Sequence, residues 1–193
     1  MKTFDLSGSL RTDLGKKATK QCRVENLVPC VLYGGEEIMH FTASNSDLRK
    51  LIYTPEVFIV NLTVGAKTVK AVVKAMQFHP LTDALLHIDF LQVFEDKKVT
   101  VEIPVAVTGL AEGVKAGGKL SLEMRKIRVK GFYNDIPEKI ELDVTALELG
   151  KKIQVAEVSV DKLEMMNAKN AVVVQVKLTR AARGAAAAAA AGK

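Results

Sequence analysis

The sequence predicts a mainly β protein (β-rich α+β) with two β-rich domains and a short tail. Three observations support this prediction. Apolar runs rich in valine and isoleucine recur from residue 57 to residue 178, which is typical of strands. Helical spacing is found in two short segments within the first 52 residues. The charged run 95–98 interrupts the apolar pattern, so we expect domains at 1–94 and 95–180, followed by a low-complexity alanine-rich tail at 181–193.

The first half begins with strand signals around a tight turn. Residues 57–64 are largely apolar in both alternate sets, which predicts a strand buried on both sides. Gly65 and Ala66 supply a turn signal, and residues 67–74 return as the second strand of a hairpin. A third apolar run, 85–94, follows the turn signal at His79 and Pro80.

Two helices are expected before these strands. Residues 44–47 have the pattern of a capping box, and Leu48, Leu51 and Ile52 then fall on one helical face. Residues 16–25 have weaker helical spacing, with Ala18 and Cys22 four positions apart.

The second half has the pattern of a separate, mostly β domain. Residues 99–107 alternate, with five β-branched side chains on one face. Glycines then mark a loop-rich stretch at 109–118. We expect further strands at 120–129, 139–144 and 171–178.

Composition narrows the function without deciding it. The chain has 28 Lys and Arg against 22 Asp and Glu, so its net charge of +6 leans mildly toward a polyanion partner. No membrane-spanning run or signal peptide is evident, and we expect a protein that stays in the reducing cytosol with Cys22 and Cys30 as free thiols. Aromatic residues make up 5% and Trp is absent, which is too few for a platform that stacks single-stranded bases.

A basic cluster near the start is the first candidate site. On a helix, Lys16, Lys20 and Arg23 share one face, which suits phosphates along a nucleic-acid backbone. Thr19 can donate a further hydrogen bond, and Arg11 precedes the cluster on the expected opening strand. Spacing alone leaves a solvated helix face equally open.

A second candidate is the pair His87 and Asp89, which point to one side of a strand. The pair could act as a general base with its orienting carboxylate, in an enzyme, or bind base edges and ribose hydroxyls, or be a structural surface pair. No nucleophile with a matching sequence context accompanies it. His40, His79 and His87 have no paired ligand spacing, so we expect neither a metal site nor a cofactor.

The basic run 125–130 places Lys126, Arg128 and Lys130 on one face of a strand. We interpret it first as an exposed sheet face, and second as an RNA or protein contact. A protein-interaction module that acts through the second domain is therefore a further alternative.

Taken in order, four motifs resemble one family. They are RTDLGKKAT (11–19) with Arg23, VPCVLYGG (28–35), QFHP (77–80) and HIDF (87–90). They are similar to the patterns R-x-x-x-G-K-x-A-S, P-A-x-x-Y-G-G, Q-x-H-P and H-x-D-F of bacterial large-subunit ribosomal protein L-twenty-five. Residues 135–144 and the following Leu149 and Gly150 resemble, less specifically, the extra β domain of the long form, also called CTC or general stress protein.

The resemblance implies a small N-terminal β-barrel that binds 5S rRNA, on a cytoplasmic ribosome, as a monomer among other large-subunit components and without catalytic activity. Phe78 stands where the family often has a basic residue, and Lys20 and Gln21 where it often has arginines, which removes bidentate phosphate contacts. Carried over by position, the RNA-binding residues are Arg11, Lys16, Thr19, Lys20, Arg23, Tyr33, Gln77, His79, His87 and Asp89.

Overall fold

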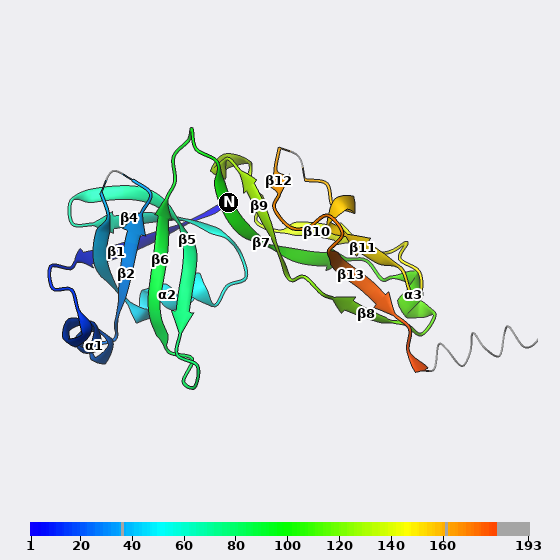
Figure 1. Ribbon diagram of the computed structural model, residues 1–193, viewed down its shortest axis with the longest axis horizontal. Coiled ribbons are helices and arrows are strands. Elements are labelled where there is room, and N and C mark those ends of the chain that lie inside the picture. Colours follow the sequence, from blue (N-terminus) through cyan, green and yellow to red (C-terminus); the bar gives the residue numbers. More distant parts are fainter. Residues whose placement is uncertain (36, 161, 181–193) are drawn as a thin grey trace, which may run out of the picture. The chain divides into compact units, whose positions relative to one another are not determined.

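The computed structural model describes residues 1–35, 37–160 and 162–180 (Figure 1). The predicted tail at 181–193 lies outside the described residues. Strands dominate, and the prediction of a mainly β fold is confirmed. In chain order the elements are β1 Lys2–Leu10, α1 Lys16–Val24, β2 Leu27–Tyr33, β3 Met39–Ser44, α2 Asn45–Ile52, β4 Phe58–Val64, β5 Lys67–Phe78, β6 Leu85–Gln92, β7 Val99–Thr108, α3 Glu112–Lys115, β8 Lys119–Leu122, β9 Lys126–Gly131, η1 Tyr133–Asp135, β10 Ile140–Asp143, β11 Lys152–Gln154, η2 Val155–Glu157, β12 Glu164–Met165 and β13 Val172–Lys177.

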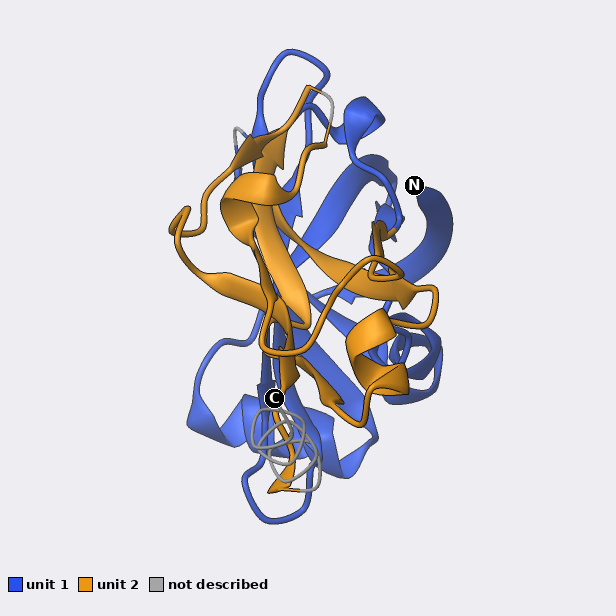
Figure 2. Cartoon of the chain, turned by 90° about the vertical axis from the view of Figure 1, so that its right-hand side faces the viewer, with its two compact units in different colours: residues 1–99, 132–138 blue, residues 100–131, 139–193 orange. Residues whose placement is uncertain are grey.

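The chain forms two compact units (Figure 2). Unit 1 comprises residues 1–99 and 132–138, and unit 2 comprises 100–131 and 139–193. In unit 1, six strands form a closed barrel in the order β1-β3-β2-β6-β5-β4, and β4 pairs with β1 in parallel to close it. Closure leaves no free sheet edge in this barrel. The barrel expected from the family resemblance is therefore present.

The predicted hairpin is confirmed as β4 and β5, joined through Gly65 in the left-handed region (φ +60°). β5 extends four residues beyond the predicted end at residue 74, because its far half pairs with β6. The prediction that residues 57–64 are buried on both sides is wrong in part. Val60, Leu62 and Val64 are buried in the barrel, whereas Thr63 is exposed, because its side of the strand is the outer wall.

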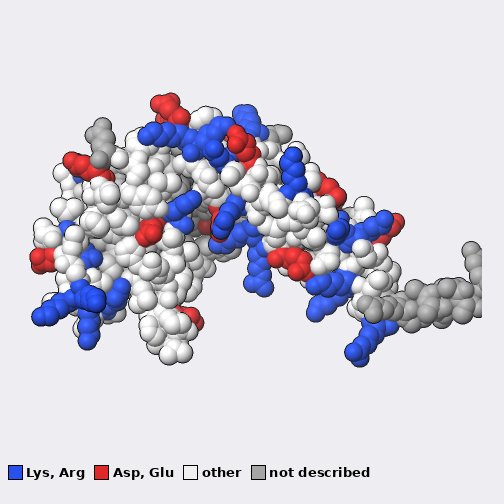
Figure 3. All heavy atoms as spheres, viewed as in Figure 1, with Lys and Arg blue, Asp and Glu red and all other residues white. Residues whose placement is uncertain are grey.

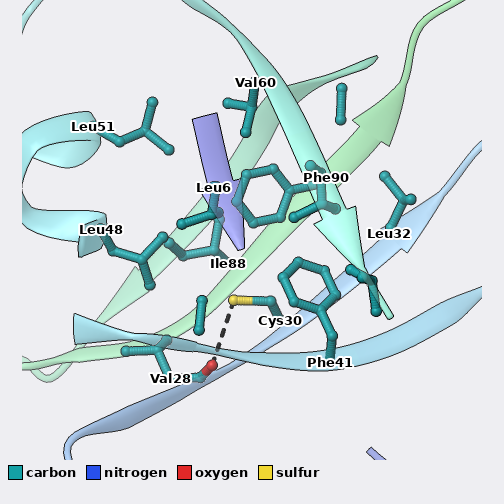
Figure 4. Close-up of a cluster of buried hydrophobic side chains, with 14 of the residues drawn as sticks. Leu6, Val28, Cys30, Leu32, Phe41, Leu48, Leu51, Val60, Ile88 and Phe90 are labelled. Atoms are coloured by element: carbon teal, nitrogen blue, oxygen red, sulfur yellow. Dashed lines mark hydrogen bonds between the residues drawn. The ribbon is translucent and has the colours of Figure 1, made fainter. Parts of the chain in front are cut away.

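The interior of the barrel is filled by aliphatic side chains around two phenylalanines (Figure 4). Phe41 and Phe90 are fully buried, and their ring centroids lie 5.7 Å apart at a tilt of 40°. Cys30 points into this core, where its Sγ lies 3.5 Å from the carbonyl oxygen of Val28. Burial raises the pKa of this thiol to about 12.

Both predicted helices are present. Leu48 and Leu51 of α2 are buried in the barrel core, as their spacing indicated. Ser44 is the N-cap, but its Oγ accepts from the backbone N–H of Ser46, one residue earlier than a capping box requires. The predicted start of the helix is therefore confirmed, whereas the predicted capping box is wrong.

Unit 2 contains two sheets, with strand orders β10-β7-β9-β12 and β11-β13-β8. The alternation of residues 99–107 is confirmed in β7, where Val101 and Ile103 are buried. The prediction of one strand at 120–129 is wrong. The backbone N–H groups of Glu123 and Met124 both bond to the carbonyl of Val173, and this bend separates β8 from β9, which joins the other sheet.

The segment 132–138 belongs to unit 1, although it follows β9 in the chain. The Tyr133 hydroxyl donates to Glu95 Oε1 (3.0 Å) and accepts from Lys70 Nζ (3.3 Å). Glu138 lies 3.6 Å from the amine of Lys2. These contacts tie the segment to the barrel. No helix in the described part of the chain is long and apolar enough to cross a membrane.

Candidate nucleic-acid interface

Helix α1 carries the basic cluster, and the predicted helix is confirmed with bounds Lys16–Val24. Figure 3 shows Lys and Arg side chains gathered over this helix. Lys16, Lys17 and Lys20 are exposed and have no ion-pair or hydrogen-bond partner among the described residues. Lys16 and Lys17 lie in the first turn, where the helix dipole disfavours cations, and Gly15 supplies no side-chain cap. Their charge does not stabilise the helix, and it leaves the helix start strongly positive.

The loop before α1 is fastened by Arg11. We predicted Arg11 on the opening strand, but the structure places it just after the end of β1. Its Nη2 donates to the carbonyl of Asp13 (3.1 Å) and to Thr19 Oγ1 (3.3 Å), and Thr19 in turn donates to the carbonyl of Gly15 (2.7 Å). Arg11 and Thr19 therefore hold the start of α1 in place, and Arg11 keeps further N–H donors available.

Arg23 fastens the other end of the helix to the barrel. Its Nε and Nη2 both donate to the carbonyl of Leu86 on β6, at 3.3 and 3.0 Å. α1 also packs against β2. Because Leu86 precedes His87, this anchor brings the basic helix beside the second candidate pair.

Strand register assembles a row of polar groups on the outer wall. Asp89 is opposite Val31 of β2, and His87 is opposite Gln77 of β5. Paired residues point to the same side of a sheet. Asp89 and His87 are half-buried, while Ile88 between them is fully buried in the core, so this side is the outside of the barrel.

His87 and Asp89 lie close to each other but are not hydrogen-bonded. Nδ1 of His87 is 2.7 Å from Oδ1 of Asp89, yet this buried ring nitrogen has no aligned hydrogen-bond partner. The pKa of the Tyr33 hydroxyl is raised, mainly because the side chain is partly buried and also because the negative charge of Asp89 is near. The side chains of His87 and Asp89 therefore form a close polar pair on the outer wall.

His79 has a different position from the other candidates. It lies in the turn of the β5–β6 hairpin, and its Nδ1 accepts from the backbone N–H groups of Leu81 and Thr82. The backbone N–H of His79 donates to the carbonyl of Ala84. His79 therefore shapes the hairpin that presents Gln77 and His87.

His40 is a residue of this surface that sequence reasoning did not single out. It lies on β3 opposite Val31, which is itself opposite Asp89, so the three residues form one cross-strand row. Only the pairing of β3 with β2 could have placed it there, because no motif surrounds it. Among the described residues, no three His, Cys, Asp or Glu side chains are grouped to hold a metal ion.

Comparison with known proteins identifies the family. The Ribosomal L25p family matches residues 6–90, and the C-terminal domain of ribosomal protein TL5 matches residues 98–180. The chain is 58% identical over 184 residues to large ribosomal subunit protein bL25 of Azobacteroides pseudotrichonymphae genomovar. CFP2, covering 95% of this chain and 97% of that protein. The bL25 proteins of Porphyromonas gingivalis (strain W83) and Bacteroides fragilis (strain YCH46) are 59% and 53% identical, and each match covers at least 96% of both chains. Two domain matches in order and full-length identity above 50% show that the chain belongs to the bL25 family of large ribosomal subunit proteins, in the form that carries a TL5-type C-terminal domain.

Proposed function

We propose that the chain binds 5S rRNA through the outer wall of its barrel and helix α1. We name this surface the α1–β6 surface. Its members are Arg11, Lys16, Thr19, Lys20, Arg23, Tyr33, Gln77, His87 and Asp89, with His79 as the residue that positions the hairpin. The supporting observation is that Arg23 holds the unpaired lysines of α1 beside the polar row of β6.

Membership of the bL25 family makes the chain a structural component of the large ribosomal subunit and not an enzyme. The acid–base alternative for His87 and Asp89 is therefore set aside. Their exposure of 29% and 27%, on an outer wall, suits contact with a macromolecule. We further propose that one copy acts on each ribosome, and that the division at 94/95 marks the end of the RNA-binding part.

The cations of α1 supply affinity in this proposal. Lys16 and Lys20 neutralise phosphates as point charges, and the uncapped backbone N–H groups of the first turn add donors for the same anion. Arg11 and Arg23 use some of their N–H groups for bonds within the protein, which leaves the remaining ones as donors for phosphate. Such contacts are independent of sequence and sensitive to salt.

The polar row supplies orientation and selectivity. Asp89 repels phosphate, so its RNA partner is an amino group or a ribose hydroxyl. His87, whose Nδ1 faces Asp89, and Gln77 opposite it can bond base edges or 2′-hydroxyls of an irregular helix through the other ring nitrogen and the amide. Tyr33 adds a hydroxyl at the same wall.

Binding of the full chain to 5S rRNA across a salt series, with transfer RNA as competitor, tests the proposal. Tight binding that survives the competitor is the expected result, because the polar row reads more than charge. Binding that the competitor abolishes would reduce the α1–β6 surface to a general polyanion patch.

The phosphate contact of a single lysine, Lys16, can then be tested. Lys16→Ala should lower the slope of log affinity against log salt by roughly 1, since one phosphate contact is lost. Lys67→Ala is the matched control, because Lys67 is exposed in the same unit and its Nζ pairs with Glu37 Oε2 at 2.8 Å. Glu37 follows the end of β2 that is distant from α1 in the chain. Equal slopes for both variants would return Lys16 to a solvated helix face.

A further inference from the structure

The net charge of the chain is not distributed evenly between the two units. Unit 1 contains 13 Lys and Arg and 13 Asp and Glu, so it is neutral as a whole despite the basic helix. Unit 2 contains 15 Lys and Arg against 9 Asp and Glu, and therefore carries the whole excess of +6. The α1–β6 surface lies in unit 1, so it does not contain the residues that give the chain this excess of positive charge.

The four-stranded sheet of unit 2 places acids beside several basic residues on and next to its strands. Arg128 donates to Glu102 at 2.8 Å, and Lys139 lies 2.6 Å from Glu141. Lys130 is opposite Glu164 in the β9–β12 register. Within the basic run at 125–130, Arg128 is thus paired with an acid of a neighbouring strand, and Lys130 lies opposite one.

The three-stranded sheet differs, because lysines gather on one of its faces. Lys177 is opposite Lys119, and Gln175 is opposite both Lys152 on β11 and Ser121 on β8. Paired and alternate residues share a side, so all five positions lie on one face, which we call the lysine face. The opposite face of the same sheet includes Val174 and Val176, which are buried.

The acid beside this face is already occupied. Glu123 accepts from Lys177 Nζ (2.7 Å), Gln175 Nε2 (2.8 Å) and Ser121 Oγ (2.8 Å). Lys119 and Lys152 have no ion-pair partner among the described residues. One carboxylate therefore accompanies three lysines, and two of these keep their full charge for a partner.

We propose that the lysine face binds the phosphate backbone of RNA in the large ribosomal subunit, separately from the α1–β6 surface. The three lysine positions span roughly 12 Å from strand rise and spacing, which suits two or three phosphates. Lysine, serine and glutamine line the face, without the apolar centre that a protein partner requires. The contact reads charge, not sequence. This inference does not depend on the function proposed for unit 1.

The test uses the full chain and large ribosomal subunits from which this protein has been removed. The variant K119Q/K152Q/K177Q should lower the salt slope of rebinding by about 2–3, at ~0.7–0.9 for each lost phosphate contact. The control K126Q/R128Q/K130Q removes the same charge from unit 2, but from the four-stranded sheet, where Arg128 is paired with Glu102, and should change the slope by less than about 1. Equal slopes for the two variants would overturn the proposal.

A reciprocal variant separates charge from misfolding. Glu123→Gln keeps an acceptor for its three donors but removes one negative charge from beside the face, so rebinding should tighten several-fold at low salt. Destabilisation alone cannot produce that sign, and thermal unfolding by circular dichroism checks each variant. Weaker or unchanged rebinding of Glu123→Gln would contradict a phosphate partner.

A photoreactive residue at Ser121 identifies the partner directly. We expect cross-links that ribonuclease removes, and a cross-link to protein that resists ribonuclease would overturn the assignment. The two proposals fail separately. Lys16→Ala is measured on isolated 5S rRNA and tests unit 1, whereas the lysine-face variant is measured on depleted subunits and tests unit 2.

Discussion

Gly8 on β1 is a position of the barrel wall where a single added methyl group would collide with the core. A Cβ at this position would lie 2.5 Å from Cδ2 of Phe41 and 3.2 Å from the carbonyl oxygen of Thr42. Phe41 is fully buried and packs against Phe90, so its ring has no free space to move into. We therefore predict that Gly8→Ala destabilises the barrel by overpacking.

The magnitude follows from the kind of collision. Forcing extra atoms into a packed core costs ~1–3 kcal/mol, because side chains leave their rotamers or the backbone shifts. The lower end requires the β1 strand to move away from β3, which closure of the barrel by β4 opposes. For a unit of this size, ~2 kcal/mol lowers the unfolding temperature by roughly 8–16 °C.

The assay is thermal and urea unfolding followed by far-ultraviolet circular dichroism, since the chain has no Trp for fluorescence. Phe41→Leu removes the obstructing ring edge, so the double variant should be more stable than the sum of the two single effects by about 1 kcal/mol or more. A Gly8→Ala protein within about 0.5 kcal/mol of the parent, or strictly additive effects, would refute the reasoning.

Two further predictions concern titratable groups. Burial raises the pKa of Cys30 to about 12. Iodoacetamide at pH 8 should therefore alkylate half-buried Cys22 in the native protein and Cys30 only after unfolding. Mass spectrometry locates the label, and labelling of Cys30 in the native protein would contradict its burial. Hydrogen bonds from Lys177 first, then Gln175 and Ser121, lower the pKa of Glu123 from 4.5 to about 2, so its stabilising contribution is present above pH 4.5 and is lost as the pH falls toward about 2. The parent protein should accordingly lose more of its unfolding temperature over that window than Glu123→Gln, and parallel curves would show that these bonds do not stabilise the sheet.

Local patterns in the sequence predicted the fold class because a barrel wall has one apolar side. The alternation in β7 and the turn at Gly65 depend on neighbouring residues alone, and both were predicted correctly. The strand expected at 120–129 was wrong because its break depends on Val173, fifty residues away, whose carbonyl captures two N–H groups at the bend. No local pattern contains that information.

The candidate surface divides in the same way. Residue types and spacing along the chain selected the basic helix and the pair His87 and Asp89, and motif order indicated the family. The sequence did not show that Arg23 bonds to Leu86, that His40 shares a row with Asp89, or that Glu123 is already paired. These facts depend on strand register and on side chains that meet across long sequence separations.

The sequence by itself therefore determined the chemistry available to this protein, namely a mainly β chain of the bL25 family with a basic helix and +6 of net charge. The tertiary structure decided where that chemistry is exposed. Ion pairs engage Arg128 in one sheet of unit 2 and Lys177 in the other, whereas Lys119 and Lys152 have no ion-pair partner among the described residues, and a closed barrel turns alternate residues outward into one surface. The reason is physical: a charge or a donor acts on a partner only if folding has not already satisfied it, and that depends on contacts distant in sequence.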